Sequence, residues 1–328
     1  MGATKQLFMQ DREQEISQED ENVETVKDQP NSELFELIGK LQRKEIKLSY
    51  SSLKEFGKSP MNFIRYKLKQ RKPQTESQIF GSLCDCLITE PERFDQLFVV
   101  NDVMPTTDNQ KGFCQDLING LNKENAFSNN YSRGKVDDLY NQFLNYVEAT
   151  KSGKTVITKS LKEEAENIIE NLKKSDLVMQ YLDSCNKFQN KLEWKTNGWD
   201  FIGYSDCSGD GLIIDLKFTR DANPDKFERD VVNYEYYMQM GMYADASNYE
   251  GVPECYFIAY DKTGNFSVIK LDYGFIKYGI RKYKYLLSKL DKCISENRFN
   301  ESYNFFDDHQ RTVYRPKWIK AVNDGVEE

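Results

Sequence analysis

The sequence predicts an α/β fold in which a central mixed sheet is flanked by helices. Two observations support this prediction. Between residues 187 and 272, short segments of alternating apolar and polar residues are separated by turn signals, which is typical of strands. Longer segments have apolar residues at helical spacing, including a stripe along residues 273–297. At about 150 residues per domain, the 328 residues allow one large or two modest domains.

The first helices are indicated by their capping residues. Ser49 caps a helix that runs to Phe56. Ser59-Pro60 interrupts the helical pattern, and a basic helix is expected over 61–72.

Further helices follow before the sheet. Residues 78–100 indicate a buried helix that ends before Pro91 and is followed by a strand. The polar segment 103–185 is mostly helical, and Ser160 and Glu163 form a capping box for one of its helices.

The C-terminal half should contain the sheet. Asn197-Gly198 is a strong hairpin signal, and a second turn at 208–211 leads into a third antiparallel strand. The first three strands are expected at 187–194, 199–207 and 212–218. A long helix at about 225–247, strands at 254–261 and 266–272, and a helix at about 273–297 complete the unit.

The composition limits the chemistry that the chain can perform. The single histidine, His309, excludes histidine-rich zinc sites and two-histidine mechanisms, and it argues against a Ser-His-Asp triad. The seven cysteines are an odd number in a long chain, so we expect reduced thiols. The sequence has no run of 18 apolar residues and no signal-peptide pattern, so we expect a cytoplasmic protein without a membrane partner. Catalysis would depend on carboxylates, lysine and an oxygen-bound metal.

The negative charge of the chain is concentrated at the N-terminus. Residues 1–36 contain ten acidic and three basic residues and so carry −7 of the formal net charge of −8. We expect residues 1–45 to be a disordered acidic leader, either a solvated tail or a segment that binds a partner or mimics DNA. A single domain would follow, helical over 46–185 and with the sheet and its helices over 186–298, and residues 299–328 would form a tail.

Two carboxylates and a lysine meet on one face of the expected sheet. In the third strand, Asp215 and Lys217 share a face with Ile213, whereas the alternate apolar residues point to the core. The turn places Asp206 roughly opposite Ile213 and therefore diagonal to Asp215. Two bare carboxylates about 4 Å apart repel by roughly 4 kcal/mol at an effective dielectric constant of 20, and a divalent cation removes this penalty. Oxygen ligands favour Mg²⁺ or Mn²⁺, and Lys217 is suited to position or deprotonate an attacking water.

Two simpler interpretations compete with this metal site. The run that begins at Asp206 resembles the start of a calcium loop, but its twelfth position is Lys217, where a bidentate glutamate is needed. An Asp-x-Lys pattern also occurs by chance on strands that only carry surface charges.

Three motifs in a fixed order resemble the RecB-like branch of the PD-(D/E)xK nuclease superfamily. They are Gly203-x-x-Asp206, Asp215-x-Lys217 and Gln239-x-x-x-Tyr243. Gln239 and Tyr243 are four residues apart, so they share one face of the expected helix. The resemblance implies a PD-(D/E)xK core, similar to that of restriction endonucleases, with helical N-terminal and middle elaborations.

Upstream segments extend the resemblance to exonuclease VIII (RecE-type) proteins of phages and prophages. The similar segments are Gly81 to Pro91, Ser51 to Phe56 and Lys154 to Thr158, and the whole resemblance covers roughly residues 46–297. The chain departs from the family at Asp85, where relatives have a metal-associated histidine. Aspartate also binds Mg²⁺.

The resemblance implies a Mg²⁺-dependent DNA exonuclease, a hydrolase that degrades one strand of linear duplex DNA from 5′ to 3′ in phage-type recombination or DNA processing. It also implies ring-shaped homo-oligomers that work beside a single-strand annealing recombinase or a single-strand-binding protein. Two alternatives remain, namely a catalytically silent DNA-end or partner-binding module of the same fold, and an endonuclease.

The resemblance also assigns roles to individual residues. The metal ligands would be Asp85, Asp206, Asp215, the Leu216 carbonyl and, as a further candidate, Glu193 on the first strand of the sheet. Lys217 would activate water, while Gln239 and Tyr243 would orient the site and the scissile phosphate.

Basic residues offer two candidate surfaces for DNA. One follows the last helix at helical spacing and consists of Lys277, Arg281 and Lys284. The other, suited to a 5′-phosphate because arginine offers bidentate contacts, consists of Arg65, Lys69, Arg71 and Lys72. Either set could equally be a solvated surface.

Overall fold

A five-stranded mixed sheet forms the centre of the protein. The computed structural model describes residues 31–68, 74–126, 133–247 and 249–306. The strands lie in the order β3-β4-β5-β6-β7, and only β5 and β6 are parallel neighbours. Their bounds are Lys187–Thr196, Trp199–Gly209, Leu212–Phe218, Glu254–Tyr260 and Phe266–Lys270. The α/β prediction and the mixed sheet are confirmed.

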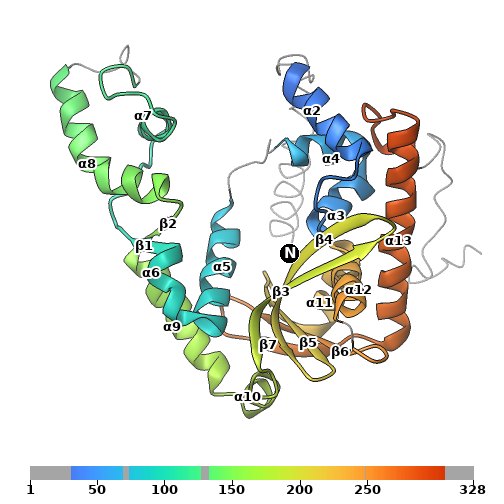
Figure 1. Ribbon diagram of the computed structural model, residues 1–328. Coiled ribbons are helices and arrows are strands. Elements are labelled where there is room, and N and C mark those ends of the chain that lie inside the picture. Colours follow the sequence, from blue (N-terminus) through green and yellow to red (C-terminus); the bar gives the residue numbers. More distant parts are fainter. Residues whose placement is uncertain (1–30, 69–73, 127–132, 248, 307–328) are drawn as a thin grey trace, which may run out of the picture.

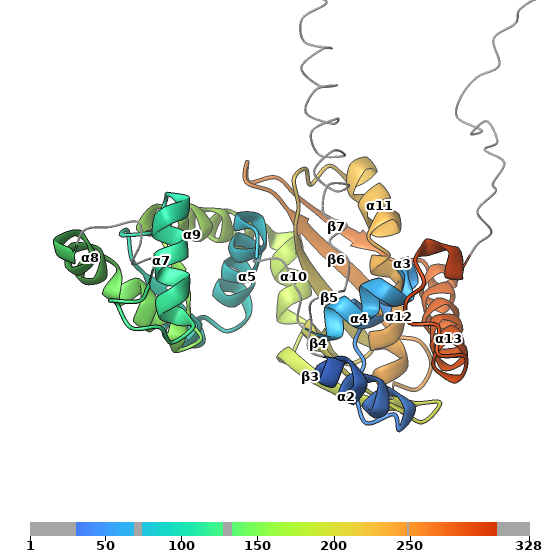
Figure 2. The ribbon, with the colours of Figure 1, turned by 90° about the horizontal axis from the view of Figure 1, so that it is seen from above.

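Helices cover both faces of this sheet (Figure 2). On one side lie α3 (Tyr50–Lys58), α12 (Tyr236–Ala246) and α13 (Tyr273–Ser295), and on the other side lie α5 (Glu76–Thr89), α9 (Lys159–Lys173) and α10 (Asp176–Asp183). The remaining helices on the first side are α2 (Asn31–Gln42), α4 (Pro60–Lys67) and α11 (Pro224–Asn233).

The two faces of β5 enter different hydrophobic cores. Ile213 packs with α3, α12 and α13, whereas Ile214 and Leu216 pack with α5, α9 and α10. The alternation predicted for this strand is therefore confirmed, but the face that carries Asp215 is also a core face. The reason is that α12 covers it, which no pattern within the strand itself could indicate.

A helical extension projects away from the sheet (Figure 1). It contains α7 (Asp108–Ile118) and α8 (Arg133–Lys151), which share a small core around Phe113 and Phe143. Between the extension and α5 lie the short helices η2 (Pro91–Arg93) and α6 (Phe94–Leu97) and a two-stranded parallel sheet of β1 (Phe98–Val100) and β2 (Thr155–Ile157). A last short helix, η3, spans Tyr303–Phe305.

The predicted turns and most predicted caps are present. Asn197 and Gly198 have φ values of 51° and 81°, as a tight hairpin requires, and Gly211 has a φ of 65°. Ser49 and Ser59 cap α3 and α4, with Pro60 at the first position of α4.

Three local predictions are wrong. The helix expected at 225–247 is divided into α11 and α12, because Glu235 adopts a left-handed conformation with a φ of 57°. The helix expected to be capped by Ser160 begins earlier, because the Thr158 side chain accepts the hydrogen bond of the Leu161 amide at 3.2 Å. Ser208, not Asp206, pairs with Ile213, so the hairpin register is shifted by two residues.

The acidic leader is only partly described. Residues 31–42 form α2, although they fall within the segment that we expected to be disordered, because Leu37 and Leu41 are buried in the core. Residues 1–30 and 307–328, which include His309, lie outside the described residues. None of the helices that the structure describes is long and apolar enough to cross a membrane.

Candidate active site

Asp215 and Lys217 form a buried ion pair in the middle of the sheet. Asp215 is only 1% exposed, and the Lys217 ammonium lies against its Oδ2 atom. On its other side the ammonium lies 4.8 Å from the centre of the Tyr236 ring. Because unpaired buried charges are costly, these two groups hold each other in their ionised forms.

Helix α12 brings Gln239 and Tyr243 to the same carboxylate. The Gln239 amide donates hydrogen bonds to Asp215 Oδ1 at 3.0 Å and to the Tyr243 hydroxyl at 3.2 Å. Gly203 on β4 makes this approach possible, since a Cβ atom there would lie 2.6 Å from Tyr243 Cε1. The glycine and the tyrosine of two separate motifs are thus in direct contact.

Asp206 lies where β4 and β5 diverge. The ladder between these strands ends at the pair Cys207–Ile214, and the Leu216 amide donates a hydrogen bond to Asp206 Oδ2 at 2.8 Å. The other oxygen accepts a hydrogen bond from the Gln189 amide at 3.2 Å, and Gln189 has an unusual φ of 44°. The carboxylate therefore replaces a strand partner for β5.

Asp85 reaches the same region from α5. The Tyr260 hydroxyl, at the end of β6, donates a hydrogen bond to Asp85 Oδ1 at 3.1 Å. Gln189 connects α5 to the Asp206 side, because its amide also donates to the Thr89 hydroxyl at 3.3 Å. Asp85 and Asp206 are half-buried, whereas Asp215 is fully buried.

The pKa values of all three carboxyl groups are raised, mainly by desolvation. Desolvation and then the Asp215 charge raise the pKa of Asp206 to about 7. Desolvation and then the Asp206 charge hold the pKa of Asp85 well above its usual range. Burial also raises the pKa of Asp215, although the Lys217 ammonium opposes this shift. When all three carboxyl groups are ionised, the cluster carries more negative charge than one ammonium can neutralise.

Lys217 responds in the opposite direction. Burial alone lowers the pKa of its ammonium, but the Asp215 and Asp206 carboxylates outweigh burial and raise that pKa overall. Lys217 is therefore protonated and cationic in this arrangement.

The donor set fits a hard divalent cation. Gln239 Oε1 is a buried oxygen atom without a hydrogen bond, and Asp215 Oδ2 has only the Lys217 ammonium against it. Carboxylate and amide oxygens are the ligands that Mg²⁺ and Mn²⁺ prefer, and a cation would offset both the desolvation and the repulsion of the ionised carboxyl groups. Within the described ranges, no three His, Cys, Asp or Glu side chains are already close enough to form a complete metal cage.

Other predicted ligands have different surroundings. Glu193 pairs with Lys47 and with Lys191, the latter at 3.0 Å, and no contact joins it to the three aspartates. The Leu216 amide donates its hydrogen bond to Asp206, and Leu216 pairs with Ile258 in the ladder between β5 and β6.

The basic residues of the two surfaces predicted to bind DNA differ in their surroundings. Lys277 and Arg281 are exposed on α13, whereas Lys284 pairs with Asp245 at 3.1 Å. Arg65 is half-buried on α4. Lys69, Arg71 and Lys72 lie outside the described residues.

Sequence reasoning missed Gln189, Tyr236 and Tyr260, which contact Asp206, Lys217 and Asp85 respectively. Tyr260 was expected on a strand, but a strand pattern does not reveal which helix faces that strand. The backbone conformation of Gln189 has no sequence signal at all, because glycine or asparagine would be expected at a positive φ.

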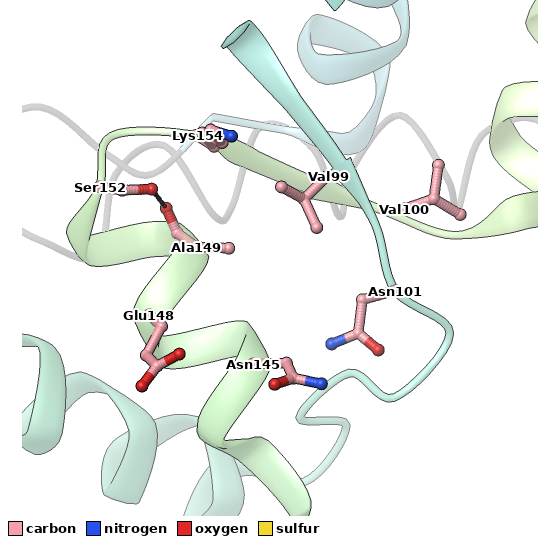
Figure 3. A pocket seen from close by; sticks show the side chains of 8 residues that line it. All are labelled: Val99, Val100, Asn101, Asn145, Glu148, Ala149, Ser152 and Lys154. Carbon is pink, nitrogen blue, oxygen red and sulfur yellow. Dashed lines mark hydrogen bonds between the residues drawn. The ribbon is translucent and has the colours of Figure 1, made fainter. Parts of the chain in front are cut away.

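A separate hollow of about 390 Å³ lies between α8 and the β1–β2 sheet (Figure 3). Its lining mixes apolar and polar side chains, namely Val99, Val100, Asn101, Asn145, Glu148, Ala149, Ser152 and Lys154. The Ser152 hydroxyl donates to the Ala149 carbonyl at 2.7 Å. None of the residues predicted to form the site lines this hollow.

Comparisons with known proteins relate the chain to one family and to solved structures. A family model described as a PDDEXK-like domain of unknown function (DUF3799) matches residues 49–302. The crystal structure of a candidate exonuclease from Eubacterium rectale is similar with a TM-score of 0.50 and 15% identity, covering 84% of this chain and 92% of that chain. An alkaline exonuclease from Laribacter hongkongensis has a TM-score of 0.27 and 14% identity, covering 56% of this chain and 90% of that chain. No curated protein matches the sequence.

Proposed function

The chain belongs to this PDDEXK-like family, and from that premise we propose that it is a metal-dependent deoxyribonuclease. The observation that carries the proposal is the buried cluster of Asp215, Lys217 and Gln239, with Asp206 and Asp85 beside it. A cluster with raised carboxyl pKa values is costly to fold unless a ligand neutralises it. Chance surface charges on a strand would not incur this cost.

The three aspartates are the candidate metal ligands. Asp206, Asp215 and Asp85 would hold a divalent cation, Mg²⁺ in the first instance and Mn²⁺ as an alternative. When bound, the cation supplies charge stabilisation to the phosphodiester and lowers the pKa of water.

Lys217 is cationic, so its role is to orient the attacking water and to stabilise negative charge on the phosphate rather than to remove a proton. Gln239 fixes the orientation of the Asp215 carboxylate, and Tyr243 in turn holds Gln239.

A more specific activity follows from the motif resemblance. We propose a RecE-type exonuclease that degrades one strand of linear duplex DNA from 5′ to 3′ in phage-type recombination. Homo-oligomers and a single-strand annealing recombinase or single-strand-binding partner belong to the same proposal. A single nuclease domain, expected over residues 46–298, belongs to it as well, and its core also includes Leu37, Leu41, Phe299 and Phe305. The exonuclease description of the Eubacterium rectale protein, which has a similar fold, supports this activity.

The test uses the purified full chain on end-labelled linear duplex DNA with and without Mg²⁺. We expect Mg²⁺-dependent degradation that Asp215→Asn reduces on the order of 10³-fold, since metal activation is worth several kcal/mol. Asp210→Asn is the matched control, because Asp210 is an exposed aspartate in the adjoining turn. Its activity should stay within about twofold of the wild type.

The outcomes separate the alternatives. Cleavage of covalently closed circles would identify an endonuclease. Full activity of Asp215→Asn would contradict the assignment of the site. If titration detects no binding of Mg²⁺ or Mn²⁺ and the chain still binds DNA ends, the protein is a catalytically silent module.

A further inference from the structure

A lysine surrounded by tyrosines lies next to the candidate active site. The Lys54 ammonium, on α3, lies 5.7 Å from the ring centre of Tyr50, 5.3 Å from that of Tyr234 and 6.0 Å from that of Tyr236. The Tyr236 ring also lies 4.8 Å from the Lys217 ammonium. One aromatic ring therefore separates Lys54 from the proposed catalytic lysine.

Lys54 differs from the lysines around it in having no carboxylate partner within the part of the chain that the structure describes. Lys58, one turn further along α3, pairs with Glu55 at 2.9 Å, and Lys282 pairs with Glu235 at 3.3 Å. Burial and then the Lys58 charge lower the pKa of Lys54, so the ammonium is poorly compensated where it lies. An anion bound at this point would compensate it.

The exposed ring in this group is Tyr234. It is 48% exposed, although it is a large aromatic residue, and it immediately precedes the left-handed Glu235. The Tyr50 hydroxyl donates a hydrogen bond to the Tyr234 carbonyl at 2.6 Å and so fixes this junction between α11 and α12. The left-handed conformation of Glu235 costs roughly 1–2 kcal/mol. This strained residue directly follows the exposed Tyr234 ring.

We propose that Lys54 and Tyr234 form a strand-binding subsite, in which Lys54 binds a backbone phosphate next to the scissile one and Tyr234 stacks on the adjoining base. The inference rests on the proposed function, because it takes a DNA strand as the substrate. A cation beside an exposed aromatic ring is the combination that binds single strands without sequence preference. Tyr236, in contact with both ammonium groups, sets the spacing between this phosphate and the reacting one.

The experiment measures binding separately from cleavage. Binding of a fluorescein-labelled single strand of about 12 nucleotides is measured in EDTA with full-length Asp215→Asn protein, into which substitutions at Lys54, Lys58 and Tyr234 are introduced. Cleavage is measured as kcat and KM with the same substitutions in the otherwise wild-type chain. Lys54→Met keeps the apolar stem of the side chain, and Tyr234→Phe keeps the ring. Lys58→Met is the matched control on the same helix, because Lys58 already has a carboxylate partner.

We expect Lys54→Met to weaken binding about tenfold and to reduce the slope of log K against log salt concentration by about 0.7, the value for one phosphate contact on a single strand. Tyr234→Ala should weaken binding about tenfold without changing the slope, whereas Tyr234→Phe should bind like the parent protein. An abasic strand of the same length should bind the parent and Tyr234→Ala proteins equally. In cleavage, the loss should be found in KM rather than in kcat.

An unchanged salt slope in Lys54→Met, or a loss in Lys58→Met of the same size, would overturn the phosphate contact. Equal binding of abasic and normal strands by the parent protein would overturn the stacking and favour a general anion site, such as one for an acidic peptide. If binding depends on both residues but no variant or wild-type protein cleaves DNA, the subsite stands and the proposed nuclease activity fails.

Discussion

Two regions of the protein collect polar side chains, and they do so in opposite ways. The cluster around Asp215 lies within the layers of the fold, and its charged groups are paired, hydrogen-bonded and shifted in pKa. The hollow between α8 and the β1–β2 sheet is an open space of about 390 Å³, in which Asn145 and Glu148 are exposed to water. The charged groups of the first region are packed together and partly or fully desolvated, whereas the polar groups of the second line an open space and contact water.

The difference indicates which of the two regions needs a ligand to be stable. Exposed polar side chains cost little, because water satisfies them, so the hollow needs no ligand to be stable. Three neighbouring carboxyl groups, one fully buried and two half-buried, are unfavourable, so their position calls for a physical reason. We therefore expect substitutions to separate the two regions by the size of their effects.

The largest effect is expected from Lys217→Met. This change removes the only ammonium that contacts Asp215 among the described residues and leaves a buried carboxylate unpaired. We expect the free energy of unfolding at pH 8 to fall by about 3 kcal/mol, with a smaller loss at pH 5, where the carboxyl groups can take up protons. Urea unfolding at the two pH values measures this difference.

The matched control for that experiment is in the hollow. Lys154→Met makes the same chemical change at a half-buried position of the lining, and the free energy should change by no more than about 0.5 kcal/mol. Equal losses at positions 217 and 154 would remove the distinction between the two regions.

A smaller effect is expected from Gly203→Ala. The new Cβ atom would lie 2.6 Å from Tyr243 Cε1, so the tyrosine ring has to move. Gln239, whose amide is hydrogen-bonded to the Tyr243 hydroxyl, would be displaced as well. We expect a loss of about 1–3 kcal/mol in thermal or urea unfolding, together with weaker binding of divalent cations.

Gly57→Ala is the control for this prediction. A Cβ atom at Gly57, on α3, would be 3.5 Å from Leu286, which is an ordinary contact. Stability should therefore be unchanged or slightly increased, because alanine is the better helix former. If Gly203→Ala and Gly57→Ala have the same free energy of unfolding and the same affinity for divalent cations, the close contact between Gly203 and Tyr243 does not determine the geometry of the site.

The most gradual effect concerns pH. The pKa of Asp206 is raised to about 7 in the folded chain, above the ordinary value of about 3.9 in an unfolded one. The folded state then binds more protons between these values, so the metal-free protein should lose up to about 1.4 kcal/mol of stability per pH unit as pH rises from about 4 to 7. Melting curves in EDTA across this range test the slope.

Asp206→Asn should flatten that dependence, because the group no longer titrates. Addition of Mg²⁺ should stabilise the wild-type protein most above pH 7, where protons no longer compete with the cation for the carboxylates. A metal-free protein that becomes more stable between pH 5 and 7 would contradict the raised pKa.

The sequence alone was sufficient for the strands of the central sheet, the positions of its hairpin turns and the three motifs, because each depends on neighbours a few residues away. It was not sufficient for the register of β4 and β5. The alternation of β5, the Asn197-Gly198 turn and the cap at Ser49 are set by backbone geometry and local hydrogen bonds, and all are present. The family could be recognised for the same reason, since Asp215-x-Lys217 and Gln239-x-x-x-Tyr243 are local spacings.

Only the tertiary structure decided how these local patterns meet. The contact of Gly203 with Tyr243, the covering of Asp215 by α12 and the break at Glu235 depend on which elements pack together. Such contacts join residues far apart in the chain, and their energies are summed over whole surfaces rather than over a few neighbours. For that reason the sequence identified the charged residues, whereas packing decided that they share one buried site and that Lys54 and Tyr234 lie at its edge.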